Sequence, residues 1–169
     1  MISELTTIES LLLSYRDGTK KPHDVVAKFL EKIETHNAYY SAYQSVWGEE
    51  ALAGAELATK AIAAGHDLGP LHGVPFALKD IFHVTDKVTT CGTVELSQNV
   101  AKVTATVVRR LVNAGAIILG KTKTVECAFG GWGTNQMTGT PRNPWDDDIH
   151  RIPGGSSSGS AVAVASDLA

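Results

Sequence analysis

No uninterrupted apolar stretch in the sequence comes near the ~20 residues that a membrane-spanning helix requires. The N-terminal segment MISELTTIESLL also lacks the basic start and the apolar run of a secretory signal. These two absences predict a protein without a membrane span, and we expect it in the cytoplasm.

Cysteine is scarce, because Cys91 and Cys127 are the only two in the sequence. They form neither a CxxC pair nor a zinc-ligand spacing, so we expect two free, buried thiols in a reducing compartment. The histidines show no HxxxH or HExxH spacing. The acidic run Asp146, Asp147 and Asp148 is typical of a solvated turn rather than a metal site. We therefore expect no metal site.

A large excess of charge of either sign is also missing. The net charge is -3, from 15 basic and 18 acidic residues, which is too mild to indicate nucleic acid or an anionic membrane as a partner. No basic block interleaved with aromatic residues occurs, so direct nucleic-acid binding is not expected. The length of 169 residues and the hydrophobic fraction of 43% are those of an ordinary globular domain.

Helical periodicity and short apolar runs alternate along the chain. A capping box, Thr6 to Glu9, predicts a short helix that ends at Asp17–Gly18. Further helices are expected over 22–36, 49–64, 104–114 and 161–165, and strands over 43–47, 74–78 and 116–119. In the 104–114 helix, the side chains expected to face inward are Val107, Val108, Leu111 and Val112. This alternation predicts an α/β fold, a sheet covered by helices.

A long Gly-, Thr- and Asn-rich loop, 130–155, leads into the segment GGSSSGS. On local composition this segment is a helix-capping loop. A phosphate-binding loop is excluded, because no lysine follows the glycines. The nucleophile-elbow pattern GxSxG is matched by residues 155–159, with Ser157 at its centre, but no clear strand precedes it.

Lys79 directly follows the apolar residues FAL of an expected buried strand. Most lysines are solvated surface charges. At the end of a buried strand, however, loss of water lowers the pKa of the ammonium group, and a neutral lysine can act as a general base. Serine–lysine pairs are a known variant of the serine–histidine–acid arrangement.

Five separated motifs, in this order, resemble the amidase signature family over about residues 20–169. They are GPLHGVPFALKD, TTCG at 89–92, GAIILGKT at 115–122 with Glu126 after it, RNPWD at 142–146, and PGGSSSGSAVAVA at 153–165. The resemblance implies the family's fold, a mixed β-sheet covered by helices. It also implies that residues 1–169 are the N-terminal part of a single domain that continues beyond residue 169.

The resemblance implies a role for several residues. Lys79 matches the family's lysine base, and Ser156 matches its bridging serine, which follows a cis peptide bond. Ser157 matches a supporting hydroxyl close to that pair. Ser158 stands where the family usually has glycine. The segment Gly130, Gly131 and Trp132 resembles the stretch that lines the acyl pocket, although ordinary packing of Trp132 is the alternative. The nucleophilic serine and the oxyanion-hole amides are expected beyond Ala169.

The function implied is hydrolysis of the C–N bond of a carboxylic amide through an acyl-enzyme, with no cofactor. An alternative is the glutamine-hydrolysing A-type subunit of a tRNA-dependent amidotransferase. The segment FGGWGTNQ departs from the Ser/Thr-rich run expected of that subunit, which favours the simple amidase. A non-catalytic fragment or scaffold module is the alternative from another class. The expected partners are a small-molecule amide and the remainder of the same polypeptide, with a homodimer left open.

Overall fold

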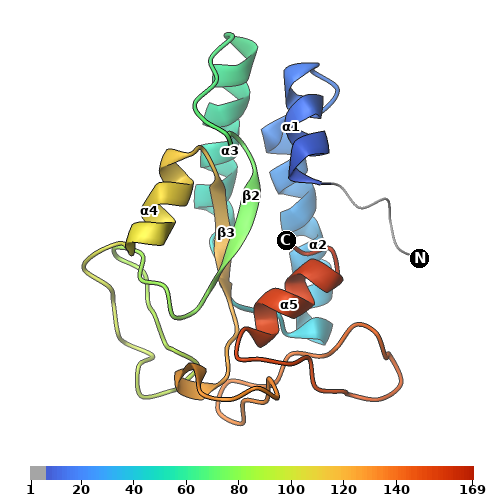
Figure 1. Ribbon diagram of the computed structural model, residues 1–169, viewed down its shortest axis with the longest axis vertical. Coiled ribbons are helices and arrows are strands. Elements are labelled where there is room, and N and C mark those ends of the chain that lie inside the picture. Colours follow the sequence, from blue (N-terminus) through green and yellow to red (C-terminus); the bar gives the residue numbers. More distant parts are fainter. Residues whose placement is uncertain (1–6) are drawn as a thin grey trace.

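The computed structural model describes residues 7–169 (Figure 1). Its helices are α1 (Ile8–Arg16), α2 (Pro22–Tyr40), α3 (Gly48–Ala63), α4 (Thr106–Asn113) and α5 (Ser158–Ala165). Its strands are β1 (Tyr43–Val46), β2 (Pro75–Lys79) and β3 (Ile117–Thr122), and a single 3-10 turn, η1, covers Glu126–Ala128. The predicted alternation of helices and strands is confirmed.

The first helix begins at a side-chain cap. The hydroxyl of Thr7 accepts a hydrogen bond from the amide of Ser10, 3.1 Å away. The predicted capping box placed the cap at Thr6, which lies outside the described residues. The predicted end at Asp17 is confirmed, because the following Gly18 turns the chain with a φ of 77°.

The second helix is longer than predicted. We expected it to end near Asn37, but it continues to Tyr40 and ends at Ser41, whose φ is 55°. The Asn37 side-chain oxygen accepts the amide of Tyr43 at 2.8 Å. Asn37 therefore lies within the helix, and its side chain accepts a hydrogen bond from a backbone amide beyond the helix end. For this reason the asparagine did not mark the end of the helix.

The three strands form one mixed sheet in the order β1-β3-β2. β3 runs antiparallel to β1 and parallel to β2, and the parallel register pairs Lys79 with Thr122. Gly120 allows the close approach of β1, because a Cβ at this position would lie 2.2 Å from the Ser45 carbonyl oxygen. The predicted mixed sheet is confirmed.

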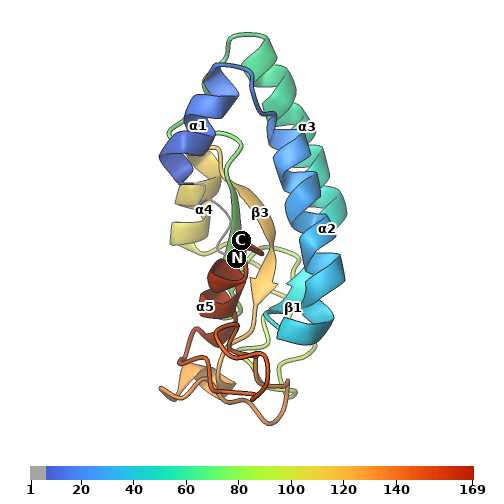
Figure 2. The same cartoon turned by 90° about the vertical axis from the view of Figure 1, so that its right-hand side faces the viewer.

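Helices cover both faces of this sheet (Figure 2). α2 and α3 lie together on one face, and α1, α4 and α5 lie on the other. The buried core joins these layers, and it includes Val26, Ile33, Ala55, Leu119, Val162 and Leu168. Within residues 7–169, none of the helices combines the length and the apolar character needed to cross a membrane.

Two expectations about burial are wrong. In α4 only Val108 is fully buried, while Val107 and Val112 are 46% and 44% exposed. The helix has just eight residues, and Val108 is its one buried residue within the described chain. The thiols are free, but Cys127 is exposed and Cys91 is half-buried. Cys127 lies in the η1 turn beyond the end of the sheet, where the core does not reach.

Candidate functional site

The carboxyl ends of β2 and β3 lie at the same end of the sheet, because the two strands are parallel. The loops that leave them, together with the loop before α5, gather at this end of the molecule (Figure 1). Lys79 is the last residue of β2. The strand therefore presents the lysine at the edge where three connecting segments meet.

Lys79 and Ser156 are in direct contact at this edge. The Lys79 Nζ donates a hydrogen bond to the Ser156 Oγ over 2.6 Å, across 77 residues of sequence. The Gly155–Ser156 peptide bond is cis, as the resemblance predicts. The fold thus brings together the two residues that the sequence analysis singled out first.

The backbone of Ser156 is held by the segment that follows β3. Its carbonyl oxygen accepts hydrogen bonds from the Val125 amide at 3.0 Å and from the Thr124 hydroxyl at 2.9 Å. The preceding Gly155 packs directly on Gly133, because an added Cβ would lie 2.8 Å from the Gly133 nitrogen. Gly155 and Ser156 are therefore both anchored by groups from the segment 124–133.

The first turn of α5 is anchored to the same strands. The Gly159 amide donates to the Lys123 carbonyl at 3.0 Å, and the hydroxyls of Ser160 and Thr122 lie 2.7 Å apart. Thr122 is fully buried and donates to the Leu78 carbonyl at 3.1 Å. These bonds link the start of α5 through β3 to β2, one residue before Lys79.

The environment of Lys79 shifts its side chain in the direction of the neutral amine. The side chain is half-buried, and loss of water lowers the pKa of its ammonium group below the ordinary lysine value. Within residues 7–169, Lys79 forms no ion pair with a carboxylate, so nothing there offsets this shift. A neutral amine 2.6 Å from a hydroxyl can accept its proton.

A buried ion pair lies directly beside this lysine in the sequence. The Asp80 Oδ1 is 3.2 Å from the Lys121 Nζ, and both side chains are 1% exposed. The contact is electrostatic, since Oδ1 accepts no well-directed hydrogen bond. The other carboxylate oxygen accepts from the amide and hydroxyl of Thr90, and Lys121 donates to the Val88 carbonyl. The pair thereby fixes the 88–90 segment to the ends of β2 and β3.

The other predicted site residues do not contact this pair. Ser157 is the exposed N-cap residue of α5, and its side chain makes no capping hydrogen bond. Gly130, Gly131 and Trp132 are exposed. Trp132 is 72% exposed, so it does not pack into the core that residues 7–169 form. The segment nevertheless lies between Val125 and Gly133, the two positions that contact the Ser156 loop.

The acidic run forms a turn, as predicted. The Asp146 carboxylate accepts from the amides of Asp148 and Ile149 and pairs with Arg151. Among residues 7–169, no three His, Cys, Asp or Glu side chains are grouped as metal ligands.

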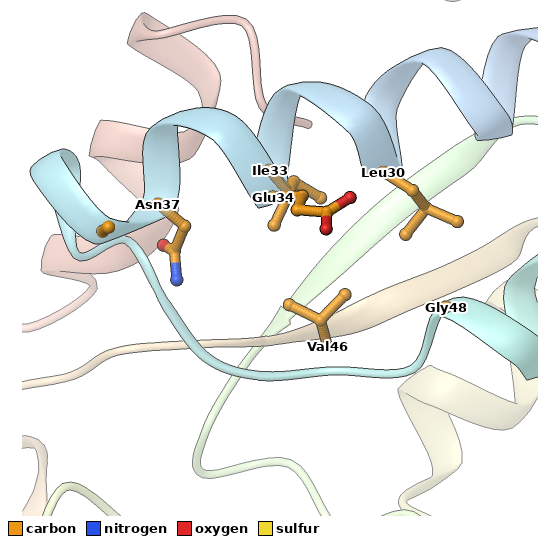
Figure 3. Close-up of a pocket in the computed structure, with 7 residues that line it drawn as sticks. Leu30, Ile33, Glu34, Asn37, Val46 and Gly48 are labelled. Carbon is orange, nitrogen blue, oxygen red and sulfur yellow. The ribbon is translucent and has the colours of Figure 1, made fainter.

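A separate hollow lies away from this pair. It measures about 490 Å³ and lies between α2 and the segment from β1 to α3, on the opposite side of the sheet from α5. Figure 3 shows Leu30, Glu34 and Asn37 facing Val46 across it. It holds one carboxylate and no nucleophile, and its Asn37 already bonds Tyr43. This hollow therefore supports no chemistry of its own.

Several supporting residues escaped the sequence analysis, namely Thr122, Thr124, Gly133 and Ser160, as well as the Asp80–Lys121 pair. The signal for the pair was present, because Asp80 follows Lys79 and Lys121 stands in an apolar strand. The register of β2 against β3, which places Leu78 beside Lys121, is needed to connect them.

The family model named Amidase matches residues 24–169. The A-type subunit of glutamyl-tRNA(Gln) amidotransferase from Mycolicibacterium gilvum is 42% identical over 167 residues, which cover 97% of this chain and 33% of that protein. A peptide amidase structure from Stenotrophomonas maltophilia is 32% identical with a TM-score of 0.88, covering 98% of this chain and 35% of that one. A structure of 6-aminohexanoate cyclic dimer hydrolase is 29% identical with a TM-score of 0.80, covering 92% and 31%.

The fold is that of the solved peptide amidase and cyclic dimer hydrolase structures that the chain resembles. The chain belongs to the amidase signature family, since the family model matches most of its length. It spans about a third of the length of the curated relatives that it matches.

Proposed function

We propose that the protein to which residues 1–169 belong hydrolyses the C–N bond of a carboxylic amide. The observation that supports this most directly is the 2.6 Å contact between the Lys79 Nζ and the Ser156 Oγ. A half-buried lysine without a carboxylate partner beside a serine hydroxyl can act as a proton relay. Membership of the amidase signature family supports amide hydrolysis as the reaction in which this relay takes part.

In the proposed reaction, neutral Lys79 removes a proton through Ser156 from a nucleophilic serine. The oxygen of that serine bonds to the amide carbonyl carbon, and a tetrahedral intermediate forms. Protonated Lys79 returns the proton through Ser156 to the departing nitrogen, and the C–N bond breaks. Water then hydrolyses the ester and releases the acid. The relay ends in its starting state, so protons balance over the cycle.

We further propose that the domain continues past residue 169 and that the continuation supplies the nucleophilic serine and the oxyanion hole. The match to the family extends to residue 169 while the chain spans a third of its relatives. Residues 1–169 alone are then expected to be inactive. An intact-mass measurement of the source protein should show several hundred residues; a natural product of 169 residues would contradict this.

Within the proposed enzyme, Gly130, Gly131 and Trp132 form part of the acyl pocket. Two observations support this proposal: the three residues are exposed, and Val125 and Gly133, on either side of them in the sequence, contact Ser156 and Gly155. Ser157 is proposed to support the relay from the N-cap position of α5.

The test is hydrolysis of a panel of small and aryl amides by the full-length protein. Lys79→Ala should lower kcat by about 100-fold or more, because the general base is lost, while circular dichroism stays unchanged. Lys102→Ala changes an exposed lysine outside the site and is the matched control. Near-normal turnover of the Lys79→Ala variant would remove the relay from the reaction.

A second candidate is the glutamine-hydrolysing subunit of a tRNA-dependent amidotransferase. It is favoured by the 42% identity to such a protein, which exceeds the 32% identity to peptide amidase. This candidate predicts stable partner subunits and ammonia release from glutamine. Purification of the full-length protein from its source distinguishes the two: co-purifying subunits with glutaminase activity favour the second, and a single active species on other amides favours the first.

A further inference from the structure

Two turns that carry the cysteines are in direct contact near the site. The Cys127 amide donates a hydrogen bond to the Cys91 carbonyl oxygen over 2.8 Å. Because one backbone hydrogen bond joins the two residues directly, their Cα atoms are close enough for the span of about 4.4–6.8 Å that a disulfide bridges. The backbone therefore holds the two residues at a separation that is compatible with a disulfide.

The contact between the turns does not depend on the thiols. The buried Asn135 side chain donates to the Gly92 carbonyl at 2.7 Å and to the Thr124 carbonyl at 2.9 Å. One amide group thus ties the residue after Cys91 to the segment that leads to Cys127. The fold itself holds the two cysteines next to each other.

The two thiols differ in access and reactivity. Cys127 is exposed and Cys91 is half-buried. Burial raises the pKa of the Cys91 thiol most strongly. The negative charges of Asp80 and of a Cys127 thiolate raise this pKa further. An oxidant therefore meets Cys127 first, and Cys91 stands next to the product.

We propose that Cys91 and Cys127 are a modification site that a peroxide converts into a reversible intramolecular disulfide. The Cys127 thiolate attacks one peroxide oxygen, which forms a sulfenic acid and releases water after protonation. The Cys91 sulfur then bonds to the Cys127 sulfur and displaces a second water. Two thiols and one hydrogen peroxide give one disulfide and two waters, so atoms and electrons balance.

The bridge would connect two parts of the candidate site. The Cys91 amide donates a hydrogen bond to the Asp80 carbonyl oxygen at 3.0 Å. The preceding residue, Thr90, donates to the Asp80 carboxylate. Cys127 lies three residues before Gly130. Oxidation thus joins the turn beside Lys79 to the exposed Gly130–Trp132 segment. The modification itself does not require that the protein hydrolyse amides.

The experiment uses the full, natively folded chain, reduced and then exposed to hydrogen peroxide at equal concentration. Remaining thiols are alkylated, and trypsin is added without reductant. Cleavage after Lys87, Lys102, Lys123 and Arg142 places the cysteines on separate peptides, 88–102 and 124–142. A linked pair of these peptides that dithiothreitol separates is expected, with the protein still monomeric on a non-reducing gel.

The control is Cys127→Ser, which keeps the backbone amide and changes an exposed side chain. Its Cys91 should stay fully alkylated after peroxide. The proposal is overturned if the unaltered protein yields both peptides separately alkylated, if Cys127 alone is oxidised while Cys91 is alkylated, or if the bridge forms between two molecules.

Discussion

Lys79 shows how position changes the chemistry of a common residue. On a solvated helix its ammonium group would stay charged at neutral pH. At the end of β2 it is half-buried beside a serine hydroxyl and forms no ion pair within the described chain, so loss of water lowers its pKa. The same lysine therefore becomes available as a base at a lower pH.

The pH dependence of amide hydrolysis tests this. If neutral Lys79 is the base, kcat/KM of the full-length protein should rise with pH through the Lys79 pKa, with a midpoint below the ordinary lysine value of 10.5. Activity is lost below that midpoint, because the amine is protonated there. Lys79→Arg should be inactive at every pH, since a guanidinium does not deprotonate. A flat profile would argue against a lysine base.

The Asp80–Lys121 pair makes a prediction about stability. Lys121→Met leaves the Asp80 carboxylate buried without its counter-ion, and a broken buried pair costs about 3–5 kcal/mol of unfolding free energy. Urea unfolding of the variant measures this cost. The double change Asp80→Asn with Lys121→Met should recover part of the loss; equal losses in the single and double variants would show that the charge is not the cause.

At the scale of elements, the first turn of α5 decides whether Ser156 meets Lys79. The helix can approach β3 because Gly159 has no side chain: a Cβ there would lie 2.2 Å from the Ala42 carbonyl oxygen and 2.4 Å from the Lys123 nitrogen. Gly159 therefore serves packing, while Ser156 of the same segment contacts Lys79.

Gly159→Ala should push α5 away from the strand and lower the unfolding free energy by about 3 kcal/mol, as overpacking of a tight contact does. Gly131→Ala is the matched control, because open space surrounds that position. Thermal unfolding of both variants gives the comparison. Equal melting temperatures would mean that the backbone of α5 yields without cost.

The local patterns predicted the order and type of the elements because helical and strand periodicities are set by near neighbours. These patterns failed where contacts with residues distant in the sequence determine the end of a helix or the burial of a side chain. α2 continues past Asn37 because Tyr43 supplies the donor that its side chain needs. Val107 and Val112 were predicted to be buried but are exposed. Apolar spacing indicates which residues share a face of the helix, but it does not indicate what covers that face.

At the scale of the whole molecule, α5 carries apolar side chains on several faces, but the described chain buries only one of these faces. Val162 is 1% exposed and Val164 is 67% exposed in the described chain. A helix that is apolar all round belongs in the interior of a larger protein. This agrees with the proposed continuation of the domain past residue 169.

Val164→Glu gives a differential test of that continuation. In residues 1–169 alone the change is at an exposed position and should alter the unfolding free energy by less than about 0.5 kcal/mol. In the full-length protein the added segment should cover the position, and a buried carboxylate should cost about 3 kcal/mol. Val162→Glu should destabilise both. Equal, small effects of Val164→Glu in both chains would show that nothing covers α5.

The sequence by itself determined the family, the alternation of helices and strands, and the two residues Lys79 and Ser156, because motifs and periodicities are properties of neighbouring residues. Tertiary structure decided what joins them: the 2.6 Å contact across 77 residues, the Asp80–Lys121 pair, and the contact of the two cysteine turns. These depend on strand register and on which backbones approach closely, and distances between remote segments exist only once the chain has folded.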